Sequence, residues 1–160
     1  MSNNLLKRKE IRIKEYDYCQ EGMYFITICT RDRKCLLGKI SEEDKIDLSK
    51  YGQVVEKYMK SINSIYENIC INSYVIMPNH VHMICNIIYK IGSSRTPTPT
   101  NETIPFLIST LKRFTNKECK TKIWQRNYYE HIVRNEKEYI KILEYIKNNP
   151  LNWNADKYFK

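Results

Sequence analysis

The sequence predicts an α+β fold of the ferredoxin-like, split βαβ class, with one antiparallel sheet, two helices on one of its faces and a further helix at the C-terminal end. Three observations lead to this class. Runs of strand length and amphipathic runs of helix length follow one another as strand, helix, strand, strand, helix, strand. A Pro-Asn pair suits a tight turn between the two middle strands. A last helical run begins at Asn135 and stops at Pro150. This order leaves one face of the sheet open for a ligand.

The first strand and the first helix follow from residue type and spacing. The run from Tyr24 to Thr30, YFITICT, is rich in aromatic and β-branched residues, as strands are. Ser41, followed three residues later by Asp44, resembles an N-cap and indicates a helix start at that point. In the long helix that follows, apolar residues recur every three or four positions, and they form the face that we expect to be buried. It comprises Tyr51, Val54, Val55, Tyr58, Met59, Ile62 and Ile65.

A predicted hairpin carries two histidines. Its first strand spans about Ile69 to Met77, and Pro78-Asn79 forms the turn. Because side chains of a strand alternate between its faces, His80 and His82 are predicted to stand together, roughly 6.6 Å apart, away from the core. Two imidazoles at this spacing can converge on one metal ion, whereas the alternative is that they decorate a solvated face. The apolar residues of this strand are Val81, Met83, Cys85 and Ile87.

The following segment contributes a loop, a second helix and the final strand of the sheet. Residues 89–103 contain Gly, Ser, Thr and Pro without a hydrophobic period, and they predict an exposed loop within the domain. The next amphipathic run predicts a helix, and Ile123 to Gln125 is predicted to be a short last strand. The buried face of the second helix is expected to contain Phe106, Leu107, Thr110, Leu111 and Phe114.

The last predicted helix, residues 135–149, offers polar groups at its edge. Asn135 and Glu138 fit a capping box. Tyr145 lies roughly 110° from the centre of the apolar stripe, and Asn149 shares its side of the helix one turn later. A tyrosine hydroxyl and an amide oxygen in this arrangement can complete a site begun by two histidines. The buried stripe comprises Tyr139, Ile142, Leu143 and Ile146.

Charge favours a polyanionic partner. The chain has 27 Lys and Arg against 18 Asp and Glu, a net charge of +9 and a pI of about 9.2. Nucleic acid is the expected partner, and an anionic membrane surface is the competitor. No run approaches the roughly 18 apolar residues of a membrane span. The candidates for DNA contact are Arg31, Arg33, Lys34, Lys112, Arg113, Lys117, Lys120, Lys122, Arg126, Tyr128 and Tyr129. Each charge run can also be a solvated face, and the basic arm at residues 1–15 a frayed terminus.

Length and cysteine content indicate the number of domains and the cellular compartment. A chain of 160 residues is expected to form a single domain, residues 1–160, with a sizeable core. Its six cysteines form no C-x-x-C pair, which argues against a cysteine zinc site and for reduced thiols. We therefore expect a cytoplasmic protein.

Three blocks of the sequence resemble the REP-associated tyrosine transposases, a branch of the single-tyrosine HUH transposase family. They are YDYCQEGMYFITICTRDRKCLLGKI, YVIMPNHVHMI and WQRNYYEHIVRNEKEYIKILEYIKNNPLNW, and the similarity runs from about Tyr16 to Trp153. The resemblance implies the HUH endonuclease fold, with His80, His82 and Asn149 as metal ligands. It also implies Tyr145 as the nucleophile and Mg²⁺ or Mn²⁺ as the metal. Asn149 replaces the glutamine of the wider single-tyrosine group but agrees with the Asn-Pro of this branch.

The resemblance further implies a single-stranded DNA endonuclease and strand transferase that forms a 5′-phosphotyrosine intermediate. Its partner would be single-stranded or hairpin DNA with REP-like palindromes, bound by a monomer or homodimer without a membrane. The chain stops ten residues after Pro150, so we expect a C-terminal element used elsewhere for dimer formation or DNA contact to be missing or very short.

Three alternatives remain at this stage. A replication-initiator-like nickase would use the same histidines and tyrosine. A binding module of the RNA-recognition type would share the core order, but its Arg/Lys-Gly-aromatic signature is absent. A catalytically inactive or domesticated nucleic-acid-binding relative would keep the fold alone.

Overall fold

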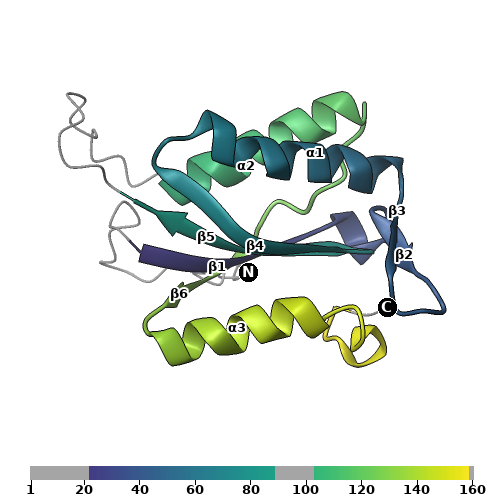
Figure 1. The fold of residues 1–160 in the computed structure, drawn as a ribbon. Helices are drawn as coiled ribbons and strands as arrows, with labels where there is room; N and C mark the ends of the chain where they lie inside the picture. The colour runs from purple at the N-terminus through teal and green to yellow at the C-terminus, as the bar shows by residue number, and fades with distance from the viewer. Residues whose placement is uncertain (1–21, 89–102, 159–160) are drawn as a thin grey trace, which may run out of the picture.

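The structure is a computed structural model that describes residues 22–88 and 103–158. Its strands are β1 (Gly22–Cys29), β2 (Gly38–Ile40), β3 (Ile46–Leu48), β4 (Ile69–Met77), β5 (His80–Ile87) and β6 (Tyr129–Val133). Its α-helices are α1 (Lys50–Ile65), α2 (Thr103–Glu118) and α3 (Glu136–Asn148). Two short 3₁₀ helices are η1 (Arg31–Arg33) and η2 (Trp153–Ala155). Figure 1 shows α1 and α2 on one face of the main sheet and α3 on the other.

The main sheet has four strands in the order β4-β5-β1-β6, and all neighbours are antiparallel. This is the ferredoxin-like arrangement that the sequence predicts, and β1 and β5 occupy its centre. Cys29 of β1 pairs with His80 of β5, and Thr27 pairs with His82. The histidines therefore lie on a central strand, close to the turn that joins β4 to β5.

The last strand of the sheet is β6, and the prediction of a strand at Ile123 to Gln125 is wrong. That segment makes one isolated bridge, between Thr30 and Trp124. The reason is that β1 extends only one pair beyond Cys29 along this edge, while residues 23–27 pair with residues 129–133. A hydrogen bond of 2.8 Å, donated by Arg31 N to the Ile123 oxygen, still holds the segment beside η1.

Helix α1 begins later than predicted. Ser49 is its N-cap, and the Ser49 Oγ accepts a hydrogen bond from Gly52 N at 3.2 Å. Ser41 instead stabilises the turn between β2 and β3, where its Oγ accepts a hydrogen bond from Lys45 N. A Cβ atom on Gly52 would lie 2.0 Å from the Leu37 oxygen, so only glycine fits where α1 meets that loop.

The larger core lies between the sheet and the helices α1 and α2. The predicted inward residues of β5 are all in it, together with Ile26 and Ile28 of β1. The predicted stripe of α2 is partly wrong, because Phe106 and Phe114 are 52% and 39% exposed. The buried stripe of α2 comprises Ile104, Leu107, Ile108, Leu111 and Thr115.

The opposite face of the sheet is not open, which corrects the sequence-based expectation. Helix α3 packs on it and forms a smaller core of Phe25, Ile84, Val133 and Ile146 (Figure 1). Consequently His80 and His82 are 0% and 1% exposed rather than solvated. The predicted stripe residues Tyr139, Ile142 and Leu143 pack against this smaller core.

A capping interaction fixes the start of α3 as predicted. Asn135 is the N-cap and its side chain accepts a hydrogen bond from Glu138 N at 2.9 Å. The second half of the capping box does not form. In a capping box the Glu138 carboxylate would accept a hydrogen bond from Asn135 N, but here it accepts one from Arg134 N at 2.7 Å and also bonds His131 of β6 at 2.5 Å. These contacts join α3 to the edge strand.

Other sequence-based expectations concern residues with little or no description. The basic arm at residues 1–15 and most of the loop at 89–103 lie outside the described residues, and α2 starts at Thr103. The described cysteines, Cys29, Cys35, Cys70, Cys85 and Cys119, are free thiols. Within the described ranges, none of the helices has the length and apolar content that a bilayer crossing requires.

Candidate active site

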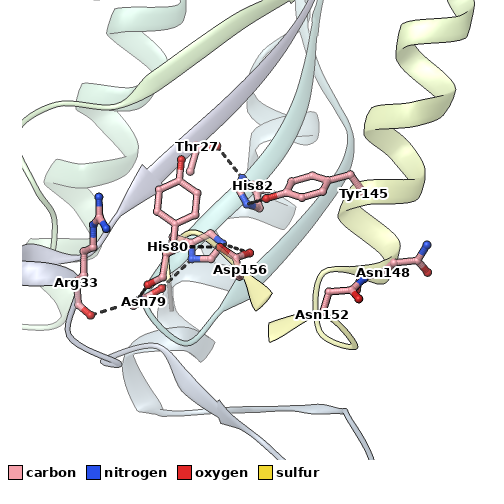
Figure 2. A network of polar contacts seen from close by, with 10 residues as sticks. Thr27, Arg33, Asn79, His80, His82, Tyr145, Asn148, Asn152 and Asp156 are labelled. Carbon is pink, nitrogen blue, oxygen red and sulfur yellow. Dashed lines mark hydrogen bonds and ion pairs between the residues drawn. The ribbon is translucent and has the colours of Figure 1, made fainter. Parts of the chain in front are cut away.

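Two imidazole rings lie at the centre of the site. His80 and His82 project from β5 toward α3, and their ring centroids are 4.4 Å apart in an edge-on arrangement. Figure 2 shows His82 facing Tyr145 of α3, with His80 beside Asn79 and Asp156. The alternation of the strand therefore brings both histidines to the same face, as predicted.

Hydrogen bonds fix the orientation of each imidazole. His80 Nδ1 lies 2.8 Å from Asn79 Oδ1, and the Asn79 Nδ2 donates to the backbone oxygens of Arg33 and Tyr158 at 3.2 and 2.7 Å. Because these carbonyls occupy the amide hydrogens, Oδ1 must accept, and His80 must carry its proton on Nδ1. His82 Nδ1 lies 2.7 Å from Thr27 Oγ1. The second nitrogen, Nε2, of each ring is thus directed into the site.

Burial keeps both histidines neutral. Burial lowers the pKa of His80 to about 4, although the nearby Asp156 carboxylate opposes this shift. Burial and the neighbouring His80 lower the pKa of His82 to about 2. Neutral imidazole is the form that binds a metal ion, so both rings are ready to act as ligands near pH 7.

The edge of α3 brings a phenol and an amide to the histidines. The Tyr145 hydroxyl lies 3.2 Å from His82 Nε2, and the Tyr145 side chain is 40% exposed. Asn149 is buried at the end of the same helix. Burial, followed by the negative charge of Asp156, raises the pKa of Tyr145 to about 12. The one-turn spacing of Tyr145 and Asn149 thus places both side chains at one centre.

Asp156 joins the centre from the C-terminal segment, and sequence reasoning missed it. Its Oδ2 lies 3.9 Å from His80 Nε2, and its Oδ1 accepts a hydrogen bond from Tyr158 N at 2.7 Å. Ligand atoms of His80, His82 and Asp156 lie within 4.8 Å of one another. The Tyr158 ring covers His80, with centroids 4.6 Å apart. No periodic pattern precedes Asp156, so only its acidic side chain after the last helix could have indicated it.

The donor set fits a hard divalent cation. His80 Nε2 and Asn149 Oδ1 are buried, and neither has a hydrogen-bond partner of acceptable geometry among the described residues. Unpaired buried acceptors are costly unless a ligand satisfies them. Two imidazole nitrogens with amide and carboxylate oxygens form a mixed set of the kind that binds divalent metal ions.

The basic turn η1 lies near this centre. Arg31 and Lys34 are exposed, and the Arg33 guanidinium lies 5.6 Å from the centre of the Tyr158 ring. Because Tyr158 covers His80, the Arg33 guanidinium lies close to the histidines.

The predicted cations of α2 are placed differently. Lys112 donates to the backbone oxygens of Gln125, Arg126 and Asn127 at 2.8, 3.1 and 3.3 Å, so its ammonium holds the loop before β6 instead of facing solvent. Arg113 and Lys117 lie on α2, which covers the face of the sheet opposite α3, so they are across the sheet from the histidines (Figure 1). Lys120, Lys122 and Arg126 follow α2 in the segment that leads to β6, and Ile123 of that segment accepts a hydrogen bond from Arg31 N. All five of these cations are exposed.

Tyr128 and Tyr129, both predicted to contact DNA, lie on opposite faces of the sheet. Tyr128 packs against the larger core, whereas Tyr129 is 45% exposed and lies in edge contact with Phe25, 6.4 Å between centroids. Tyr129 and Tyr145 line the same pocket, of about 600 Å³, together with Lys157 and Asp156.

Comparison with known proteins identifies the family to which this fold belongs. The family model described as "Transposase IS200 like" matches residues 19–149. An uncharacterized Haemophilus influenzae protein is 36% identical over 168 residues, which cover 95% of this chain and 93% of that protein. An Escherichia coli REP-associated tyrosine transposase is 30% identical over 81 residues, 51% of this chain and 44% of that protein.

A solved structure has the same fold. It is a REP-associated tyrosine transposase bound to a REP hairpin, with a TM-score of 0.62 and 22% identity, and the match covers 91% of this chain and 76% of that chain. The ferredoxin-like sheet and the covering helix are thus those of an HUH transposase fold. The chain belongs to the IS200-like transposase family, in the branch of the REP-associated tyrosine transposases.

Proposed function

We propose that this transposase is a metal-dependent single-stranded DNA endonuclease and strand transferase with Tyr145 as its nucleophile. The observation that carries the proposal is the contact between the Tyr145 hydroxyl and His82 Nε2, 3.2 Å, beside the unpaired His80 Nε2 and Asn149 Oδ1. A phosphodiester that lies against these groups meets a hydroxyl nucleophile and a set of metal-binding atoms at once.

The reaction is a phosphoryl transfer to tyrosine. The Tyr145 hydroxyl gives up its proton, and its oxygen forms a bond to the scissile phosphorus while the bond from phosphorus to the 3′-oxygen breaks. The departing 3′-oxygen takes up a proton and becomes a free 3′-OH, and the DNA stays linked as a 5′-phosphotyrosine. Because this link is still a phosphodiester, a 3′-OH can attack it, release Tyr145 and rejoin DNA without ATP.

His80, His82 and Asn149 would hold the metal ion, and the position of Asp156 makes it a fourth candidate. Mg²⁺ or Mn²⁺, when bound, would offset the negative charge that develops on the phosphate oxygens. Asn79 and Thr27 orient the two imidazoles through their Nδ1 atoms. Such supporting hydrogen bonds fix the tautomer and the direction of ligand histidines.

The phenol needs activation before it can attack. Burial and Asp156 raise the pKa of Tyr145 to about 12, so almost none of it is phenolate near pH 7. His82 Nε2 is a basic atom in contact with the hydroxyl, but it could not accept the proton if it also bound a metal ion. We therefore assign the proton to solvent or to the DNA, with positive charge at the centre favouring the phenolate.

The expected substrate is hairpin DNA with an unpaired flank. A relative with this fold is named as bound to a REP hairpin. The net charge of +9 and the exposed turn at Arg31 and Lys34 fit a phosphate backbone. Single-stranded palindromes of the REP type are therefore the DNA to test first.

The test is to incubate the protein with Mn²⁺ and labelled single-stranded hairpins from palindromic repeats that flank its gene. A protein-DNA adduct that survives denaturation should form, and Tyr145→Phe should abolish it. Tyr139→Phe, a matched change in the smaller core face of the same helix, should still form the adduct. An adduct that persists in Tyr145→Phe, or that peptide mapping places on Tyr128 or Tyr129, would overturn the assignment.

A further inference from the structure

The pocket beside Tyr145 extends well beyond the tyrosine hydroxyl. Its volume of about 600 Å³ falls within the range of about 300–1,000 Å³ that is usual for small-ligand sites. Phe25 lines it from β1, Tyr145 from α3, Tyr129 from β6 and Lys157 from the C-terminal segment. Strand β1 and three successive parts of the C-terminal region thus meet around one space next to the nucleophile.

An exposed aromatic ring stands across the pocket from the nucleophile. Phe25 is in edge contact with both Tyr129 and Tyr145, with centroid distances of 6.4 and 6.1 Å. Tyr129 and Tyr145 therefore flank a single phenylalanine ring. The preceding residue, Tyr128, packs against the larger core under the Lys112 ammonium, so its ring is not at the pocket.

A cation accompanies the exposed ring. Lys157 Nζ lies 5.5 Å from the centre of the Tyr129 ring and 4.9 Å from that of Tyr158. An exposed aromatic face with a neighbouring cation is the combination by which proteins bind single-stranded nucleic acid. The amides of Asn148, at the end of α3, and Asn152, in the turn after it, add donors and acceptors to the pocket lining (Figure 2).

We propose that this pocket holds one unpaired nucleotide next to the scissile phosphate, with its base stacked on Tyr129 and a phosphate near Lys157. The inference rests on the proposed function, since it takes Tyr145 as the attacking residue. A base inside a duplex has both faces covered by its neighbours, so the pocket selects the single-stranded flank and not the paired stem. Stacking uses the ring face, which every base has, so Tyr129 binds without strong sequence preference.

The first test is photochemical cross-linking in a Tyr145→Phe background, where transfer to the nucleophile cannot occur. The probe is a short mixed-sequence single strand with 5-iododeoxyuridine in place of thymidine. Irradiation should join the base to the ring on which it stacks, and peptide mapping should locate the link at Tyr129. A link at Tyr128, Phe106 or Phe114 instead, or no link, would overturn the proposal.

The second test is affinity for the same strand without irradiation. Tyr129→Ala should weaken binding about 5-fold to 150-fold, which is the usual effect of removing one stacking ring. Tyr129→Phe, which keeps the ring, should retain the affinity. Phe106→Ala is the matched control, because Phe106 is an exposed ring on α2, across the sheet from the pocket. Unchanged affinity in Tyr129→Ala, or an equal loss in Phe106→Ala, would contradict the pocket.

Neither test requires a DNA bond to break. A cross-link at Tyr129 without any Tyr145 adduct would leave the pocket standing and the proposed chemistry refuted. An adduct at Tyr145 with no effect of Tyr129→Ala on affinity would support the proposed chemistry and refute the nucleotide pocket.

Discussion

Thr27 and Asn79 determine which nitrogen of each buried histidine is left for a metal ion, so they matter as much as the histidines themselves. His80→Ala is a poor test of the centre, because His80 is fully buried and its removal would also leave a cavity. An open face of the sheet would let this change spare the fold, but α3 covers that face. A change at a supporting residue separates the two effects better.

Thr27→Val removes one hydroxyl and keeps the shape of the side chain. His82 Nδ1 loses its partner at 2.7 Å, and we expect Mn²⁺ affinity to fall about 10- to 100-fold, as for other supporting residues of metal sites. Calorimetric titration with Mn²⁺ measures this. Thr115→Val is the control, because Thr115 is equally buried but bonds Trp124 Nε1 on the far side of the sheet. Equal Mn²⁺ affinity in the two variants would count against His82 as a ligand.

Acid should destabilise the metal-free protein. The pKa values of His80 and His82 in the folded chain, about 4 and about 2, lie below the ordinary value of 6.5. The unfolded chain therefore binds more protons in this window, and stability that is present above about pH 6.5 is lost as the pH falls toward about 4. Urea unfolding with a chelator at about pH 7 and about pH 5 tests the sign. A free energy of unfolding that is equal or higher at the lower pH would contradict it.

The predictability of single residues follows from local geometry. His80 and His82 were predictable because alternation along a strand needs no tertiary information, and Tyr145 and Asn149 because one helical turn brings them together. Asn79 was interpreted only as a turn residue, since its role depends on the Arg33 and Tyr158 oxygens that tertiary structure brings to it.

At the scale of elements, α3 positions the candidate nucleophile through one buried side chain next to it. Ile146 is buried against Phe25, Ile84 and Val133. Ile146→Ala should lower the free energy of unfolding by about 2–5 kcal/mol and reduce adduct formation, because Tyr145 adjoins the cavity. Ile140→Ala on the same helix, where the side chain is exposed, should cost less than about 0.5 kcal/mol. Urea denaturation compares the two, and equal losses would mean that the smaller core does not hold α3.

The errors in predicting helices and strands arose where the sequence pattern fits two different structures equally well. Helix α2 carries apolar residues around much of its circumference, so Phe106 and Phe114 compete with Ile104 and Ile108 for the core, and only the tertiary packing decides which are buried. The edge strand β6 mixes Tyr, Glu and His with Ile and Val, which hides its alternation. Its pairing with β1 is a long-range property.

At the scale of the whole molecule, the exposed cations lie on different elements. Arg31 and Lys34 are exposed at the turn η1, whose Arg33 reaches the Tyr158 ring, whereas Lys45 lies on the β2–β3 hairpin in an ion pair with Glu43. Binding of single-stranded hairpin DNA should weaken with salt, with a log-log slope of about −0.7 for each phosphate neutralised. Arg31→Ala and Lys34→Ala should each reduce the slope by about 0.7, and Lys45→Ala should leave it unchanged. Fluorescence anisotropy over a salt series measures the slopes, and a slope insensitive to all three changes would argue against a phosphate track at η1.

The order of the elements was sufficient to predict the strand order of the sheet, because one split βαβ arrangement satisfies it, although the last strand was assigned to the wrong residues. It did not predict that α3 and residues 150–158 return over the second face. That coverage depends on side chains such as Ile146 and Asp156, whose partners lie on strands far away in the sequence.

The histidines of the candidate site lie on β5 and the tyrosine lies on α3, and these two elements differ in how easily they unfold locally. β5 is paired along both edges, by β1 and β4, whereas α3 is attached through the smaller core and the contacts at its start. Amide protons of β5 should therefore exchange with solvent only when the whole domain unfolds, and those of α3 should exchange through an earlier, partial detachment. During that detachment the histidines keep their geometry while the phenol is withdrawn. On warming, strand-transfer activity should therefore be lost at a lower temperature than the one at which the sheet unfolds.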